Sequence, residues 1–338
     1  MTRTALALSL LITFSASAYT AFTPDARTGP AAFNQFEPAV AAHGDDYLAA
    51  WTSRGGVWIS TLDAPIATPL DPGNLTAHGV SLSSGRDGYF AAWTSDQQLS
   101  AAVIDSFGRV ERTTRVPIAN TSGSIGGTTY TAWNGAVHIV LCQCGTLNVT
   151  LFDDNANVIA GPIDIGNPNA RVSVTADDNG FLVVSSHVTP TADSIYGRRI
   201  SSSGVAGDWF LIRETASVVQ GLAATADGAR DIIAWGDQFG VWSMAIGEPS
   251  AQLTPAPAMV TDALVEHGRL WIAYLEGVNG APHYLTIGPD RNVTPPVRIQ
   301  FDGFPARLAS NGTSVLAVGT MAIADEDVFG SYITPASA

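Results

Sequence analysis

Short apolar runs recur along the chain at a nearly constant spacing, and each follows a turn glycine. The two clearest copies are Tyr47–Trp51, after Gly44, and Tyr89–Trp93, after Gly88. Runs of this length bounded by turn residues are typical of buried β-strands, whereas apolar positions at helical spacing do not extend over a long stretch anywhere in the sequence. The pattern therefore predicts an all-β protein.

The unit occurs seven times with a period of about 45 residues, which is the range of propeller repeats. Its turn glycines are Gly44, Gly88, Gly135, Gly180, Gly228, Gly268 and Gly312. Its apolar runs are Tyr47–Trp51, Tyr89–Trp93, His138–Cys142, Phe181–Ser185, Asp231–Trp235, Leu270–Tyr274 and Val315–Gly319. We predict a seven-bladed β-propeller of four-stranded antiparallel blades, in which each run is a second strand.

Blade three admits two assignments. Tyr130–Trp133 has the composition of a second strand, but placing it there makes the neighbouring spacings uneven. As a first strand ahead of Gly135 it keeps the period and gives Cys142 the bulky position. We predict the second assignment.

The blades are expected near residues 37–75, 78–119, 127–168, 170–215, 218–257, 259–302 and 304–335. The last blade has no fourth strand of its own, whereas residues 19–33 have no assignment. A strand from that stretch, such as Tyr19–Thr23, would complete the last blade and leave no open sheet edge. We therefore predict a single propeller domain over residues 19–338, with its ring closed by an N-terminal strand.

Residues 1–18 have the composition of a secretory signal peptide. Arg3 precedes the apolar stretch Ala5–Phe14, and Ala16–Ala18 offers small residues for cleavage before Tyr19. The apolar stretch is too short to anchor the protein in a membrane. We expect a secreted protein, in the periplasm or outside the cell, with no transmembrane anchor.

The amino-acid composition limits the classes of partner that the protein can bind. All 16 basic residues are arginine, and the formal net charge of −14 disfavours nucleic acid and anionic membranes as partners. The absence of lysine, with abundant alanine and glycine, indicates a bacterial source. Cys142 and Cys144 face the same side of one strand, and either free thiols or a labile disulfide are compatible with this spacing.

The core motif Tyr/Phe-Leu-x-Ala-Trp, as in Tyr47–Trp51, resembles that of secreted bacterial seven-bladed β-propeller repeat proteins, and the resemblance covers residues 19–338. The units lack the Gly-His and Trp-Asp pairs of WD-repeat proteins. Thr175–Gly180 has a different Asp-to-Gly spacing from the aspartate boxes of sialidases. The resemblance implies an architecture and no particular activity.

Trp51, Trp93, Trp235 and Tyr274 share one position of the repeat. Such a set could stack on a ligand, but a shared repeat position indicates a shared structural role. We predict that these rings pack between neighbouring blades.

Function is expected on the loops that join second and third strands, because loops that depart from a repeat commonly carry binding residues. The candidate binding residues there are His187, Asp193, Asp237, Glu276, Asp325 and Asp327. Carboxylates of this kind can bind Ca²⁺. Because acidic residues are common throughout the chain, a solvated acidic loop is the preferred interpretation, and no cofactor is predicted.

The chain has no Gly-x-Ser-x-Gly motif, and its histidines show no metal-binding spacing. This favours a non-catalytic binding or scaffold propeller, monomeric, that holds a protein, peptide or glycan partner on its loop face. The alternative is a carbohydrate- or lactone-directed hydrolase or lyase that assembles carboxylates from several blades, with or without Ca²⁺. The residues alone leave open whether the chain is an enzyme.

Overall fold

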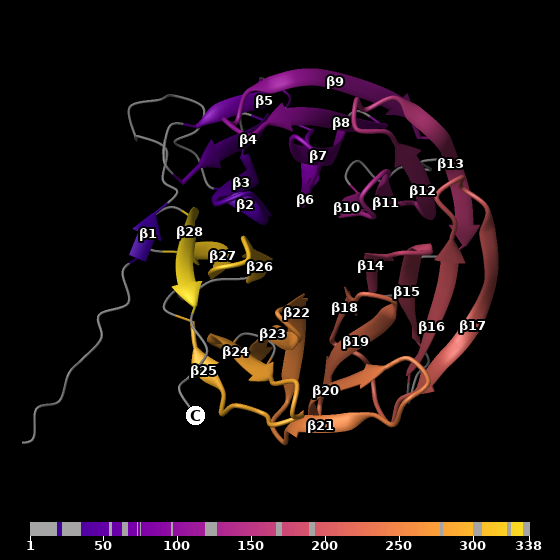
Figure 1. Cartoon of the computed structure of the whole chain (residues 1–338), viewed down its shortest axis with the longest axis vertical. Helices are drawn as coiled ribbons and strands as arrows, with labels where there is room; N and C mark the ends of the chain where they lie inside the picture. Colours follow the sequence, from indigo (N-terminus) through magenta and orange to yellow (C-terminus); the bar gives the residue numbers. More distant parts are fainter. Residues whose placement is uncertain are drawn as a thin grey trace, which may run out of the picture.

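A computed structural model of the protein describes residues 19–21, 35–53, 56–62, 67–72, 74, 76–95, 97–118, 127–166, 171–188, 193–277, 280–299, 306–322 and 326–333. Every regular element in these ranges is a β-strand, and the strands form seven four-stranded sheets. The sheets stand as blades around a central axis (Figure 1). The predicted seven-bladed propeller is therefore confirmed.

Each blade is an antiparallel sheet whose first strand lies at the centre of the ring and whose fourth strand lies at the rim (Figure 1). The first strands are β2 (Gln35–His43), β6 (His78–Ser84), β10 (Thr128–Trp133), β14 (Val172–Asp177), β18 (Gly221–Asp227), β22 (Ala258–Glu266) and β26 (Arg307–Ser310). The second strands are β3 (Asp46–Ser53), β7 (Gly88–Ser95), β11 (His138–Cys144), β15 (Gly180–Val188), β19 (Arg230–Asp237), β23 (Arg269–Glu276) and β27 (Val315–Ala322). The third strands are β4 (Gly56–Thr61), β8 (Gln98–Asp105), β12 (Thr146–Phe152), β16 (Asp193–Ile200), β20 (Gly240–Ala245), β24 (Pro282–Ile287) and β28 (Glu326–Ile333). The fourth strands are β5 (Thr68–Pro72), β9 (Val110–Pro117), β13 (Val158–Gly166), β17 (Ala206–Glu214), β21 (Ala251–Thr254), β25 (Val297–Arg298) and β1 (Tyr19–Ala21).

All seven apolar runs lie in second strands, as predicted. In blade three, Tyr130–Trp133 lies in the first strand, β10, and Cys142 on β11 pairs with Thr129. The assignment based on the repeat period is thus confirmed. Cys142 and Cys144 form a disulfide, which resolves the alternative that the sequence left open.

The second strands are buried because each is covered by neighbouring blades on both faces. Trp93 is fully buried and belongs to one apolar cluster with Leu48 and Val57 of the preceding blade. Trp51 packs in the same way with Leu316 and Val318 of blade seven. The prediction that these rings fill the space between blades is therefore confirmed, and the equivalent positions are Trp235 and Tyr274.

Blade one and blade seven meet where the two ends of the domain come together. β1 pairs antiparallel with β28, with Tyr19 opposite Ser331, and the two strands lie side by side in Figure 1. Tyr47 also donates a hydrogen bond from its hydroxyl to the carbonyl oxygen of Ser314, at 2.6 Å. That β1 is what holds the ring closed stays a prediction.

Some sequence predictions lie outside the described residues, among them the signal peptide at 1–18. In the part of the chain that the structure describes, no helix has the length and apolar character needed to cross a membrane.

The strand register defines the two faces of the ring. Gln35 at the start of β2 pairs with Ser53 at the end of β3, and Gly221 at the start of β18 pairs with Gly236 near the end of β19. The starts of the first strands therefore lie on the same face as the loops between second and third strands. We call this the upper face and the opposite one the lower face.

Candidate functional site

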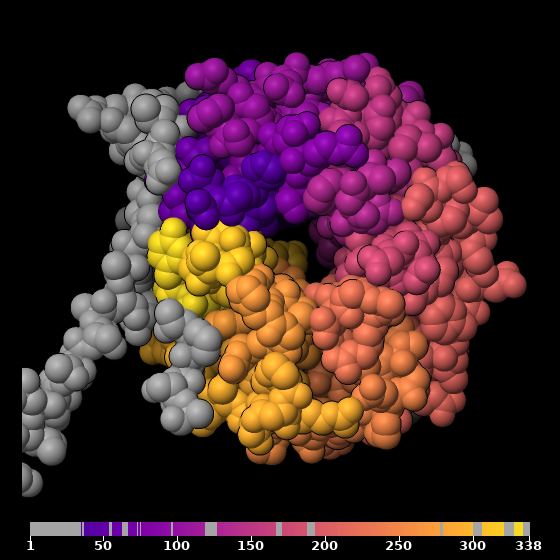
Figure 2. Space-filling model, viewed as in Figure 1, coloured from indigo at the N-terminus to yellow at the C-terminus, as the bar shows by residue number. Residues whose placement is uncertain are grey.

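The starts of the seven first strands surround a cavity of about 260 Å³ at the upper face. We call this cavity the channel mouth, and Figure 2 shows the ring hollowed at its centre. Its polar side chains include Glu37, Thr128, Tyr130, Arg171, Thr261 and Arg307. The mouth is thus built from strand ends of every blade.

Glycines allow neighbouring first strands to approach closely around the mouth. A Cβ atom on Gly221 would lie 2.0 Å from the carbonyl oxygen of Val260 in the next blade. Gly79 has a φ of +63°, and a Cβ atom there would lie 2.3 Å from the carbonyl oxygen of Gly127. Only glycine tolerates both the close approach and the left-handed backbone. The width of the mouth therefore depends on these positions.

Glu37 joins blade one to blade two at the mouth. It lies at a bulge of β2 with a φ of 51°, an uncommon conformation for a residue with a side chain. Its Oε2 accepts hydrogen bonds from the backbone N–H of Gly79 at 2.5 Å and from the hydroxyl of Thr52 at 3.3 Å. The carboxylate thus has donors from two blades.

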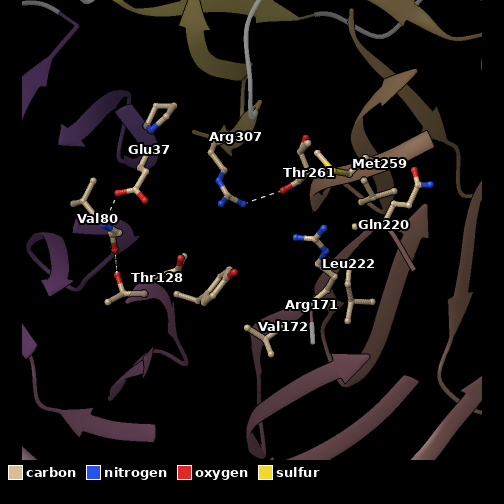
Figure 3. A pocket seen from close by; sticks show the side chains of 16 residues that line it. Glu37, Val80, Thr128, Arg171, Val172, Gln220, Leu222, Met259, Thr261 and Arg307 are labelled. Carbon is tan, nitrogen blue, oxygen red and sulfur yellow. Dashed lines mark hydrogen bonds between the residues drawn. The ribbon is translucent and has the colours of Figure 1, made fainter. Parts of the chain in front are cut away.

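Two arginines point into the mouth from opposite sides of the ring (Figure 3). Arg307, in blade seven, donates from Nη1 to the carbonyl oxygen of Thr261 at 2.9 Å. Arg171, immediately before β14 in blade four, is exposed, and its guanidinium has no carboxylate or hydrogen-bond acceptor among the described residues. Neither guanidinium forms an ion pair within the described part of the chain.

Asp262 is the acidic group next to Arg307, and its oxygens are already engaged. Oδ2 accepts from the backbone N–H of Leu308 at 2.8 Å, and Oδ1 accepts from that of Ala263 at 2.9 Å. Burial raises the pKa of the Asp262 carboxyl, and the positive charge of Arg307 acts in the opposite direction. Asp262 therefore fixes the start of β26, which carries Arg307.

Tyr130 lies within electrostatic reach of the charged groups of the mouth. Burial raises the pKa of its phenol, while the charges of Arg307 and Arg171 lower it and that of Glu37 raises it. Residues from blades one, three, four and seven therefore act on one small volume.

Four of the six candidate residues from the sequence can be placed with their side chains, and all four lie at the upper face. Asp193 is buried, and its Oδ2 accepts from the backbone N–H of Val219 at 2.8 Å. Asp237 is also buried, and its Oδ1 accepts from the backbone N–H of Phe239 at 2.7 Å and of Gly240 at 3.0 Å. Both carboxylates therefore hold loops in place.

His187 and Glu276 are exposed. His187 lines a separate cavity of about 310 Å³ together with Ser185, Tyr196 and Trp209. Glu276 lies 3.9 Å from Nε2 of His283. Asp325 and the side chain of Asp327 lie outside the described residues. Within the described residues, no group of three or more His, Cys, Asp or Glu side chains is arranged to hold a metal ion, and calcium binding stays untested.

A serine, a histidine and an aspartate line up at the lower face, between blades two and three. Ser83 Oγ lies 3.3 Å from Nδ1 of His138, and Nε2 lies 3.5 Å from Oδ1 of Asp154. The set resembles the order of groups used in nucleophilic catalysis. However, Ser83 and His138 are buried, and Phe90 stacks on the imidazole with ring centroids 4.2 Å apart. Ser83 and His138 are thus largely shielded from solvent, and the contacts connect blade two to blade three.

Sequence reasoning missed the residues of the mouth. Each of the three charged residues lies near the start of a first strand: Arg171 just before β14, Arg307 at the first position of β26 and Glu37 at the third position of β2. The starts of the first strands converge on the axis of a propeller. A charged residue at that position of the repeat could therefore have indicated a side chain that lines the central cavity. The described loop residues predicted from the sequence lie on the same face as the mouth, and their role in binding stays a prediction.

Comparison with solved structures finds the fold in hydrolases. The chain matches a puromycin hydrolase variant complexed with PGG at 13% identity and a TM-score of 0.58, over 90% of this chain and 52% of that one. It matches another structure of puromycin hydrolase at 13% identity and a TM-score of 0.57, over 95% and 58% of the two chains. A prolyl endopeptidase structure matches at 11% identity and a TM-score of 0.52, over 90% and 49%.

The chain thus spans about half the length of the solved structures that it matches, and at this identity the likeness establishes the fold. No protein-family model matches the chain. A search of curated proteins found no similar sequence.

These matches contradict the function predicted from the sequence. The three solved structures described above are of a puromycin hydrolase and a prolyl endopeptidase, rather than of a binding scaffold or a carbohydrate- or lactone-directed enzyme. The repeat could not reveal this, because its residues encode the packing of blades and carry no signature of the associated chemistry.

Proposed function

We propose that this chain is the substrate-receiving propeller of an amide or peptide hydrolase, with the substrate entering at the channel mouth. The observation that carries the proposal is the convergence of polar side chains from several blades on one cavity at the ring axis. The fold shared with hydrolases supports it. Because Ser83 and His138 are buried, the proposal assigns substrate binding to the propeller and bond cleavage to groups outside the described residues.

The size and lining of the mouth suit a short extended peptide. The volume of about 260 Å³ lies just below the roughly 300–1,000 Å³ of pockets for drug-sized ligands, so the mouth suits a short segment of a peptide. Apolar side chains such as Val80, Leu222 and Met259 alternate with the polar groups around the wall. A peptide has both apolar side chains and amide groups, which such a wall can contact.

Photocrosslinking tests the proposal. A tripeptide that carries a diazirine side chain is irradiated with the purified protein, and the labelled residues are mapped by mass spectrometry. We expect labels on 128–130 and 259–261, with loss of labelling under excess unlabelled tripeptide. Labels elsewhere on the ring, or labels that resist competition, would overturn the proposal.

A variant with a narrowed mouth provides the control. Thr128→Trp places a large ring on the wall of the cavity and should abolish the labelling. Ser202→Trp lies in an exposed turn and should leave it unchanged. Labelling that survives in a folded Thr128→Trp protein would show that the peptide binds somewhere else.

We also infer export of the chain and cleavage before Tyr19, with the mature propeller acting outside the cytoplasm as a monomer. The apolar stretch before the small residues at 16–18 supports this. The mass of the exported protein and its elution volume in size-exclusion chromatography test both parts.

A further inference from the structure

Arg171 and Arg307 are two arginines that line the channel mouth. Five other arginines pair with a carboxylate, in the pairs Arg86–Asp154, Arg115–Asp71, Arg199–Asp177, Arg230–Asp227 and Arg291–Glu248, whereas arginines such as Arg213 and Arg269 form no ion pair with the described residues. The two arginines of the mouth have no such partner among the described residues. What sets Arg171 and Arg307 apart is that both line one cavity, in a chain whose formal net charge is −14.

The acidic groups near them are held by other donors. Glu37 accepts from Gly79 and Thr52, and Asp262 accepts from two backbone N–H groups. Each carboxylate is thus tied to the wall of the ring. The guanidinium of Arg171 therefore keeps all its donors for a ligand, and that of Arg307 keeps those not bound to Thr261.

Two further polar atoms at the mouth lack a partner among the described residues. Thr261 is about nine-tenths buried, and its hydroxyl has no hydrogen bond. Oε1 of Gln220, a neighbour in the lining, has none either. Unpartnered buried polar atoms cost stability unless a ligand or water satisfies them. Both residues line the mouth, but these two atoms are themselves buried, so a binding site here depends on the two guanidinium groups.

We propose that Arg171 and Arg307 form a subsite that binds a carboxylate of the substrate across the channel mouth. The inference rests on the proposed function, because the mouth is taken to receive a peptide. A guanidinium presents two parallel N–H donors that match the two oxygens of a carboxylate. Placed in blades four and seven, the two groups can hold the carboxylate from both sides.

Calorimetric titration with two matched peptides tests the subsite. Acetyl-triglycine has a free carboxylate, and acetyl-triglycine amide has the same backbone without the charge. We expect the acid to bind at least about 10-fold more tightly than the amide, since charge-assisted hydrogen bonds are lost in the amide. The preference should weaken as the salt concentration rises.

Arginine variants assign the effect to named residues. Arg171→Gln and Arg307→Gln should each weaken binding of the acid by about 10- to 100-fold and leave the amide nearly unchanged. Arg307→Lys keeps the charge and a donor for Thr261, and it should retain part of the preference. Arg230→Gln, on the lower face, is the matched control and should bind like the parent protein. Circular dichroism confirms that each variant is folded.

The outcomes separate the inference from the proposed function. Equal binding of acid and amide, or a preference that survives in both glutamine variants, overturns the carboxylate subsite while peptide entry stands. If neither peptide binds, the proposed function fails. The stability of the protein with and without succinate then tests the anion site separately from peptide binding. A stabilisation by succinate that disappears in Arg171→Gln supports the anion site, and no stabilisation at all removes it.

Discussion

Glu37 in blade one accepts a hydrogen bond from the backbone N–H of Gly79 in blade two, at the edge of the channel mouth. The same carboxylate contributes to the electrostatic environment of Tyr130, as do Arg171 and Arg307. A negative charge that links two blades therefore also opposes the binding of a second negative charge in the mouth.

Glu37→Gln should strengthen the binding of a peptide carboxylate. The amide oxygen can still accept from Gly79, but the negative charge that repels the ligand is gone. We expect acetyl-triglycine to bind about 2- to 10-fold more tightly, the size of a single partly screened charge. Calorimetric titration measures it, and Glu276→Gln, at an exposed position of the upper face, is the control. Unchanged affinity in a folded Glu37→Gln protein would contradict this charge arrangement.

His138 should make the protein sensitive to acid. Burial lowers the pKa of its imidazole to about 3, although the negative charge of Asp153 acts against this. The unfolded chain takes up the proton below about pH 6.5, the ordinary value for histidine, and the folded protein does not. The free energy of unfolding should therefore fall as the pH decreases from about 6.5 to 3, by about 1.4 kcal/mol per pH unit from this group.

The variant His138→Phe isolates that contribution, because phenylalanine keeps the stacking on Phe90 and cannot be protonated. In urea unfolding at several pH values, the free energy of unfolding should fall less steeply with decreasing pH in this variant than in the parent protein. His267→Gln removes an exposed histidine, and the pH dependence of its free energy of unfolding should match that of the parent protein. Parallel pH curves for His138→Phe and the parent would show that His138 is protonated in the folded state.

Asp71 links blade one to blade two near the rim. Its Oδ2 accepts from Nε1 of the buried Trp93 at 3.0 Å, and its Oδ1 lies 3.3 Å from Nη2 of Arg115. Asp71→Ala leaves the indole N–H without an acceptor, which should lower the free energy of unfolding by about 1–3 kcal/mol. Chemical unfolding measures the loss, and the exposed Asp208→Ala is the control. Equal stability of the two variants would mean that Asp71 does not join the blades.

Deletion of residues 19–21 should destabilise the ring, because β28 then presents an unpaired edge. In a domain of this size one kcal/mol shifts the melting temperature by about 2–4 °C, and we expect a loss of at least about 4 °C. The parent for comparison starts at Tyr19, and Gln35 is kept in both proteins so that its bond to Val328 is unaffected. Identical melting curves would refute closure by β1.

The fold was predictable because its information is local and repeated. Gly44 and the run ending at Trp51 define a strand and the turn before it, and seven copies define the number of blades. The pairing of Cys142 with Cys144 was not decided by spacing, because the same strand geometry suits thiols and a disulfide.

The site was less predictable because it depends on which blades face each other. Arg171 and Arg307 are far apart in the sequence and line one cavity because the first strands of all blades converge on the axis of the ring. The acidic loop residues were visible in the sequence, but whether Asp193 and Asp237 face solvent or bind backbone N–H groups depends on side-chain geometry. Sequence spacing contains no information about that choice.

The pairing of Tyr19 with Ser331 has a consequence for biosynthesis. Of the described strands, β1 is synthesised first and β28 last, so this outer pair of strands in blade seven can form only after the strands of the other blades have been synthesised. Contacts between distant parts of a chain form slowly. During that interval the growing protein exposes an unsatisfied strand edge, and factors that shield nascent chains would act on it there.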